Sequence, residues 1–197
     1  MDASGLYHGP LEEFVTRRTA LVRELRATDR DAADAVGKLR KPAVGVWAID
    51  QLAVEHPALI TELLAAGADA RDAQQNVAAG TQTREDLHLA TGRLRDGVES
   101  AARAAVDVLE RAAHGASDET GRRIRTTLQA AATGGAPERR ALWTGTLDRE
   151  LDVAGFGAVD DPGDDTVELA AILAPYRRQT SSAPRRPAPG GYVKCGP

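Results

Sequence analysis

The chain has 197 residues, enough for one domain of roughly 150 residues with additional tails. Apolar residues make up 42% of the chain, charged residues 27% and aromatic residues only 4%, so alanine, leucine and valine must fill any core. No stretch approaches the ~18 apolar residues of a membrane span, and no apolar leader follows Met1. We therefore expect neither a transmembrane protein nor a secreted precursor, and the single Cys195 excludes an intrachain disulfide framework and a multi-cysteine zinc site.

Apolar residues recur at helical spacing through most of the chain. The pattern predicts an all-α fold, a compact bundle of six or seven helices within residues 6–174. The expected helical segments cover residues 10–27, 29–41, 42–56, 57–78, 83–114, 118–133 and 137–143, followed by a short helix over 166–174. We expect Trp47 to face the core. Gly115 fits the left-handed position after a helix, and Ser117 fits the cap of the next one.

The composition changes after residue 175 and divides the chain into an α-helical domain (1–175) and a tail (176–197). The tail has five basic and no acidic side chains, and it is rich in proline and glycine. The domain then has 20 basic and 29 acidic side chains, a net charge of −9. A segment such as the tail cannot bury enough apolar surface to fold alone, so we predict that it is disordered and flexible.

The tail is the first candidate for a binding segment. Tyr192 and Val193 are its strong apolar residues, and the neighbouring glycines would let its backbone approach a groove or a sheet edge. The residues expected to bind a protein partner are Arg177, Arg178, Arg185, Arg186, Tyr192, Val193 and Lys194. Two other interpretations stay open, a solvated end without a role and a weak, salt-dependent attraction to nucleic acid or acidic lipid.

Residues 33–52 could form a helix-turn-helix, a DNA-binding motif of two helices joined by a turn. Ala33 and Gly37 have the spacing of its first helix and turn, and three basic residues would contact phosphate: Lys38, Arg40 and Lys41. The connection is about one residue too long, and the small residues that open the second helix cannot read a base edge. We favour an ordinary helical corner in which Trp47 anchors the core.

No other motif indicates a reactive centre. Glu85 and His88 form a single Glu-x-x-His pair, whereas a di-iron bundle needs two such pairs and two further glutamates. Cys195 lies near the chain end without neighbours that would lower its pKa, and the acidic residues 160–165 lack the alternation of a calcium loop. A nucleophile elbow and a phosphate-binding loop are also missing from the sequence. We expect no catalytic, cofactor-binding or metal-binding residue.

Residues 38–53 read KLRKPAVGVWAIDQLA. This stretch resembles an uncharacterised family of actinobacterial helical proteins with a pattern like LRRPSVAAWAVNQLA. The resemblance extends over residues 5–157, with further matches at residues 6–15, 116–118, 128–131 and 146–157. It implies a helical protein without an established activity, so it supplies no catalytic residue. Relatives continue into a charged coiled coil, which the Pro/Arg tail replaces here.

These patterns predict a non-enzymatic adaptor or accessory protein in the cytoplasm. Its helical body would bind a protein partner or a second copy of the chain, and its tail would contact another surface. The alternative is a nucleic-acid-associated factor that uses the residue 33–52 corner and the basic tail.

Overall fold

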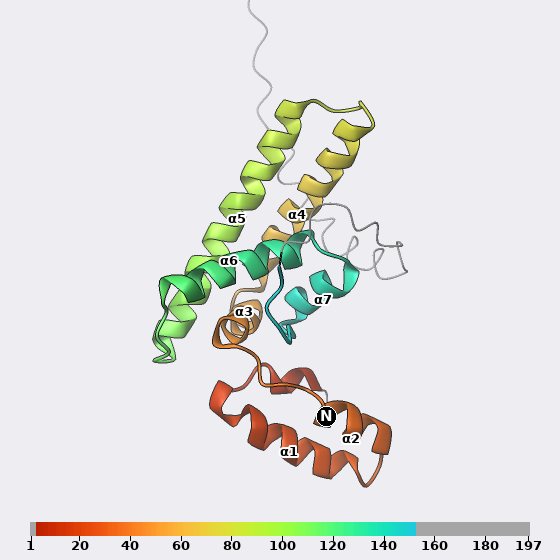
Figure 1. Cartoon of the computed structure of the whole chain (residues 1–197), viewed down its shortest axis with the longest axis vertical. Helices are drawn as coiled ribbons and strands as arrows, with labels where there is room; N and C mark the ends of the chain where they lie inside the picture. The colour runs from red at the N-terminus through yellow and green to blue at the C-terminus, as the bar shows by residue number, and fades with distance from the viewer. Residues whose placement is uncertain (1–2, 153–197) are drawn as a thin grey trace, which may run out of the picture.

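The computed structural model describes residues 3–152, shown in colour in Figure 1. The expected helix over 166–174 and the whole predicted tail lie outside these residues. As predicted, the described part is all-α, with seven α-helices, two short 3-10 helices and no strand. The elements are η1 (Ala3–Leu6), η2 (Leu11–Glu13), α1 (Phe14–Leu25), α2 (Arg30–Gly37), α3 (Val44–Glu55), α4 (Pro57–Ala78), α5 (Arg84–Arg111), α6 (Asp118–Thr133) and α7 (Ala136–Thr144).

Side-chain caps mark where three of the seven α-helices begin. The Thr83 hydroxyl accepts the backbone N–H of Asp86 at 3.2 Å, and the Asp86 carboxylate accepts the backbone N–H of Thr83 at 2.9 Å. This reciprocal pair satisfies two N–H groups that lack an intrahelical partner at the start of α5. Ser117 caps α6 and Asp29 caps α2 in the simpler one-sided way, and Pro57 occupies the first turn of α4.

Two predicted boundaries are wrong. The segment over residues 38–43 is a non-helical connection, because Pro42 disfavours helical backbone at the residue before it, and α3 begins at Val44 rather than at Pro42. The long helix ends at Arg111, and the left-handed residue is Ala113, with φ 57°, rather than Gly115. The N–H groups of Ala113 and His114 reach back to the carbonyls of the last turn, as in a Schellman motif.

Helices α3 to α7 form the larger of two units, which we call the bundle. α3 lies at its centre and packs against α4, α5, α6 and α7. Eight of the twelve residues of α3 are buried, so this helix is apolar around most of its circumference, as a central helix must be. The largest side chains in the bundle that are fully buried belong to several helices: Ile49, Leu52, Ile60, Leu63, Leu64, Leu109, Ile124, Leu128 and Leu142.

α4 and α5 form a long antiparallel hairpin, and α6 crosses it. The crossing is close at Gly67, where an added Cβ would lie 2.3 Å from the carbonyl oxygen of Ala132 on α6. Beside it, Arg71 donates to the same carbonyl at 2.9 Å. Figure 1 shows that the far ends of α4 and α5 extend beyond α6 and α7. We call this part, residues 72–94, the hairpin arm.

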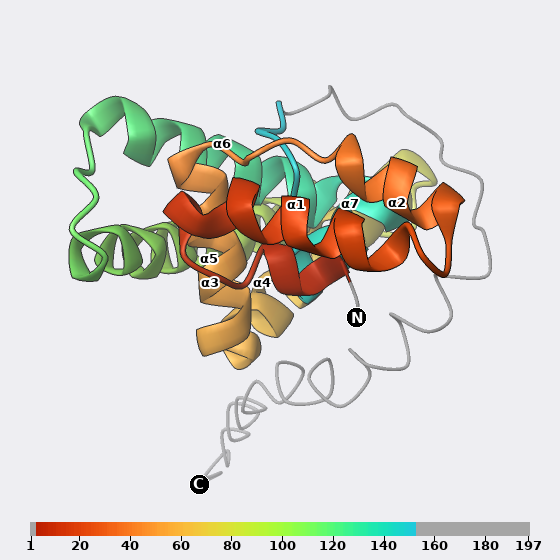
Figure 2. The same cartoon turned by 90° about the horizontal axis from the view of Figure 1, so that it is seen from below.

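Helices α1 and α2, together with η1, form the smaller unit, which we call the N-terminal unit (residues 3–39). Its core contains five buried residues: Leu6, Tyr7, Phe14, Leu21 and Val36. The rings of Tyr7 and Phe14 meet edge to face, with centroids 5.6 Å apart. Figure 2 shows α1 and α2 side by side across one end of the bundle. The sequence pattern did not separate these two cores.

Candidate functional site

The residues predicted to bind a protein partner all lie outside the described part of the chain, so their placement is not described. They are Arg177, Arg178, Arg185, Arg186, Tyr192, Val193 and Lys194. Residues 160–165 and Cys195 also lie outside it. The candidate surfaces below therefore belong to the helical body.

The corner over residues 33–52 is not a helix-turn-helix. The first six residues after Val44 are all buried in the bundle, so α3 cannot enter a DNA groove. Lys38, Arg40 and Lys41 are exposed on the non-helical connection before α3. The structure thus gives these three cations access to solvent but not the recognition helix that the motif requires.

Trp47 anchors the core, as predicted. Its side chain is buried, its indole meets the ring of His114 edge to face at 5.3 Å, and its Nε1–H donates to the carbonyl of Gly9 at 2.8 Å. Because Gly9 precedes α1, the indole joins the N-terminal unit to the bundle. The sequence predicted the burial of Trp47 but not this junction.

Further polar contacts hold the same junction. His8 Nε2 lies 3.0 Å from the carbonyl oxygen of Thr144 and 3.1 Å from the carbonyl oxygen of Gly145. Because a carbonyl oxygen can only accept a hydrogen bond, Nε2 carries the proton and donates. Gln51 on α3 donates to the carbonyl of Tyr7 at 2.9 Å. The acceptors are backbone carbonyls, which every residue has, so no residue type in the sequence indicates these contacts and sequence reasoning missed them.

Beneath this junction lies a buried carboxyl group. Asp50 is fully buried; its Oδ1 accepts the N–H of Leu147 at 2.9 Å, and its Oδ2 has no partner among the described residues. Burial raises the pKa of Asp50 to about 8, against the lowering effect of the bond from Leu147. The backbone oxygen of Asp50 approaches Gly145 so closely that a Cβ there would lie 2.7 Å away, and Gly145 is left-handed with φ 63°. Asp50 thus contacts the chain just after α7 and holds it against α3. In the sequence, an aspartate within an apolar run was the signal that could have indicated this buried group.

A hollow of about 780 Å³ lies between the N-terminal unit and α7. Its wall includes the rings of Tyr7, His8 and Trp143 and the hydroxyl groups of Thr144 and Thr146. Burial raises the pKa of the Tyr7 phenol, with Asp148 and Asp50 as smaller causes. This tyrosine therefore stays protonated throughout the physiological range.

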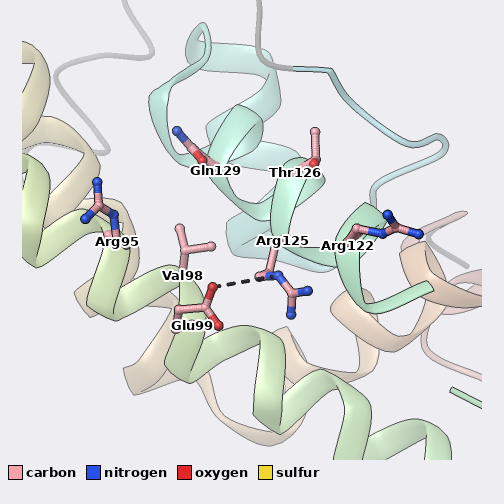
Figure 3. A pocket seen from close by; sticks show the side chains of 7 residues that line it. All are labelled: Arg95, Val98, Glu99, Arg122, Arg125, Thr126 and Gln129. Carbon is pink, nitrogen blue, oxygen red and sulfur yellow. Dashed lines mark ion pairs between the residues drawn. The ribbon is translucent and has the colours of Figure 1, made fainter. Parts of the chain in front are cut away.

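A second hollow, which we call the arginine groove, has a volume of about 370 Å³ and lies between α5 and α6. Figure 3 shows its lining, to which α5 contributes three residues and α6 four. The residues are Arg95, Val98, Glu99, Arg122, Arg125, Thr126 and Gln129. The four α6 residues share one face of that helix because each lies three or four positions from two of the others.

The arginine groove is basic, and its positive charges are spread apart. Arg125 Nε lies 3.7 Å from Glu99 Oε1, and Arg122 pairs with Glu119 at 2.6 Å. Arg95 forms no ion pair with any described residue. In Figure 3 the guanidinium groups of Arg95 and Arg122 lie on opposite sides of Arg125 and point away from one another. Guanidinium, hydroxyl and amide groups together can bind carboxylate or phosphate oxygens. Sequence reasoning missed the groove, which exists only where two helices cross.

Among the described residues, no group of three His, Cys, Asp or Glu side chains is placed to hold a metal ion. Glu85 and His88 are both exposed near the start of α5. No helix in the described part of the chain is both long enough and apolar enough to cross a membrane.

The fold and surfaces define an all-α protein of two helical units with an open basic groove. Comparison of the chain with protein-family models, with curated proteins and with solved structures finds no match. The resemblance to the actinobacterial family therefore stays a prediction.

Proposed function

We propose that this chain is a non-enzymatic adaptor of the cytoplasm, which binds a protein partner through its helical body and its C-terminal tail. The observation that carries the proposal is the hairpin arm, residues 72–94, which extends beyond the rest of the bundle (Figure 1). No other helix of the described residues extends alongside this part of the pair (Figure 1), so a partner helix can pack along it and complete a larger helical unit.

The outer face of the arm has the composition of a contact surface. Leu89 on α5 is 57% exposed, the most exposed of the large apolar residues in the described structure. Glu85 lies one turn before it and Arg93 one turn after it, and both are exposed. An apolar residue bordered by charges matches the arrangement of an interface, in which an apolar centre is surrounded by a polar rim.

The kind of basic residue also supports protein binding. Every basic side chain between residues 42 and 152 is an arginine, and none is a lysine. Arginine is enriched in protein interfaces, where lysine is depleted, because its planar guanidinium forms paired hydrogen bonds and is less strongly hydrated.

Affinity capture from the native host tests the arm. The immobilised full chain is compared with Leu89→Glu and with Val15→Glu, whose valine is 46% exposed on α1 and far from the arm. Both variants add the same charge at an exposed apolar position. We expect a protein that wild type and Val15→Glu retain equally and that Leu89→Glu retains at a level at least about fivefold lower. Equal retention by all three chains, or no retained protein with wild type, contradicts the use of the arm.

The tail is tested separately. A full chain with Tyr192→Ala and Val193→Ala is compared with one in which Ala183 and Ala188 are replaced by serine, a matched pair of changes elsewhere in the tail. The first chain should lose a partner that the second keeps. If the first chain keeps every partner of wild type, the tail is not a recognition segment.

The second candidate function is association with nucleic acid, favoured by the exposure of Lys38, Arg40 and Lys41 on one non-helical connection. Binding of this kind depends on neutralised phosphates and falls steeply as salt rises. A labelled duplex should then bind at low salt, and Lys38→Glu with Lys41→Glu should weaken the binding at every sequence. Duplex affinity that these substitutions leave unchanged excludes this connection as the contact.

A further inference from the structure

We propose that the arginine groove between α5 and α6 is a docking site for an extended acidic segment of a protein partner. The inference rests on the proposed adaptor function and adds the site and the chemistry of the partner. It uses a different surface from the hairpin arm.

The groove offers a row of donors along two helices. On α6, the positions from Arg122 to Gln129 extend for about 10 Å, the length of three or four residues of extended chain. Arg95 on α5 lies across from them (Figure 3). Guanidinium groups bind carboxylates in pairs of hydrogen bonds, while Thr126 and Gln129 can bond to the backbone of the segment.

The spacing of the charges favours a segment over a compact anion. A single phosphate is bound best by donors that converge on one point. Here the guanidinium groups of Arg95, Arg122 and Arg125 diverge, and Glu99 stands between α5 and α6 beside Arg125 (Figure 3). Several carboxylates spaced along a chain can each meet a separate arginine and avoid Glu99.

Glu99 also acts as a weak internal competitor for the ligand. Its Oε1 lies 3.7 Å from Arg125 Nε, longer than a charged hydrogen bond, and both side chains are more than 40% exposed. An exposed ion pair of this kind contributes little to stability. An incoming carboxylate can therefore take over Arg125 at small cost, and removal of the charge on Glu99 should favour it.

Fluorescence anisotropy with a labelled peptide tests the groove in the full chain. The probe is a capped peptide of about eight residues that alternates glutamate and serine, with a glutamine-for-glutamate peptide as its control, at about 50 mM salt. Arg95→Glu and Arg125→Glu should each raise the dissociation constant by about fivefold or more. Arg93→Glu should leave it unchanged, because residues two positions apart on a helix point about 200° apart. This control changes the net charge by the same amount.

A gain of affinity provides the second readout. Glu99→Gln should lower the dissociation constant for the acidic peptide by about twofold or more, since it frees Arg125. Glu110→Gln, a matched change at an exposed position of the same helix, should leave it unchanged. A merely nonspecific attraction would respond equally to both substitutions and would overturn the proposal.

Other occupants give different results, each of which overturns the proposal. Inorganic phosphate that displaces the peptide at the same concentration of negative charge indicates a simple anion site. A single-stranded oligonucleotide that binds more tightly than the peptide, and whose binding is lost with Arg95→Glu and Arg125→Glu, indicates a nucleic-acid site. If the peptide binds more tightly after four aspartates of the chain are replaced by asparagine, the chain's own acidic residues compete for the groove. These four are Asp160, Asp161, Asp164 and Asp165. Loss of peptide binding with Arg95→Glu supports the groove, whether or not the arm retains a partner. No peptide binding with intact capture refutes the groove alone, and no capture with intact peptide binding refutes the arm alone.

Discussion

The N-terminal unit and the bundle are both helical but bury very different numbers of apolar residues. The bundle core contains 24 buried apolar residues, one of which, Leu11, comes from the N-terminal unit, whereas the separate core of that unit contains five. Five residues cannot offset the entropy of ordering a segment of this length, so the smaller unit depends on its contacts with the larger one. The junction, rather than the helices themselves, therefore decides whether α1 and α2 are ordered.

The largest expected effect comes from removing the indole that both regions share. Trp47→Ala deletes a buried ring and leaves the carbonyl of Gly9 without its donor. We expect the free energy of unfolding to fall by about 3–5 kcal/mol, measured by chemical denaturation followed by circular dichroism. Hydrogen exchange should show α1 and α2 losing protection first. A loss below about 1 kcal/mol contradicts the burial and the role of Trp47 in the junction.

The buried Asp50 makes the stability of the bundle depend on pH. Its pKa is about 8 in the folded chain and near 3.8 in the unfolded chain, so the folded state retains a proton that the unfolded state releases. Stability therefore falls as pH rises from about 4 and reaches its full loss above about 8. Between pH 6 and 9 wild type should lose about 2–3 kcal/mol more than Asp50→Asn, which cannot ionise. Parallel pH curves for the two chains contradict this role.

Two glycines of the bundle should respond in opposite ways to alanine. A Cβ at Gly67 would overlap the carbonyl oxygen of Ala132, so Gly67→Ala should push α4 away from α6 and cost about 1–3 kcal/mol. At Gly92 on α5 an added Cβ meets nothing within 4 Å, so Gly92→Ala should stabilise by up to about 1 kcal/mol through helix propensity. Thermal unfolding of both variants measures the contrast. A neutral Gly67→Ala would show that the helices do not approach so closely.

The sequence predicted what local patterns determine. Apolar periodicity located the helices, and Pro57, Thr83 and Ser117 marked the starts of three of them, because these signals act within one or two turns. The left-handed residue after the long helix was predicted at Gly115 but is Ala113. Glycine is preferred at such a position, but the residue at which the helix ends decides where the position falls.

The candidate sites were harder to predict because they depend on how helices cross. Arg95 and Arg125 come together only when α6 packs across α5, and nothing near either residue in the sequence indicates the other. The contacts at His8 are similar, as their acceptors are backbone carbonyls more than 130 residues away. The division into two cores has the same origin, since it depends on which helices pack together in space and not on the apolar pattern of any one helix.

The smallest expected effect is the most specific to the junction. His8→Ala removes the ring nitrogen that donates to the chain after α7, which should lower stability by about 1 kcal/mol. Because the N-terminal unit has little core of its own, the change should appear in hydrogen exchange as faster opening of α1 and α2, while α4, α5 and α6 keep their protection. His56→Ala is the matched control, since His56 is exposed and its side chain caps nothing at the start of α4. Uniformly faster exchange throughout all helices would show instead that the two regions unfold as one cooperative unit.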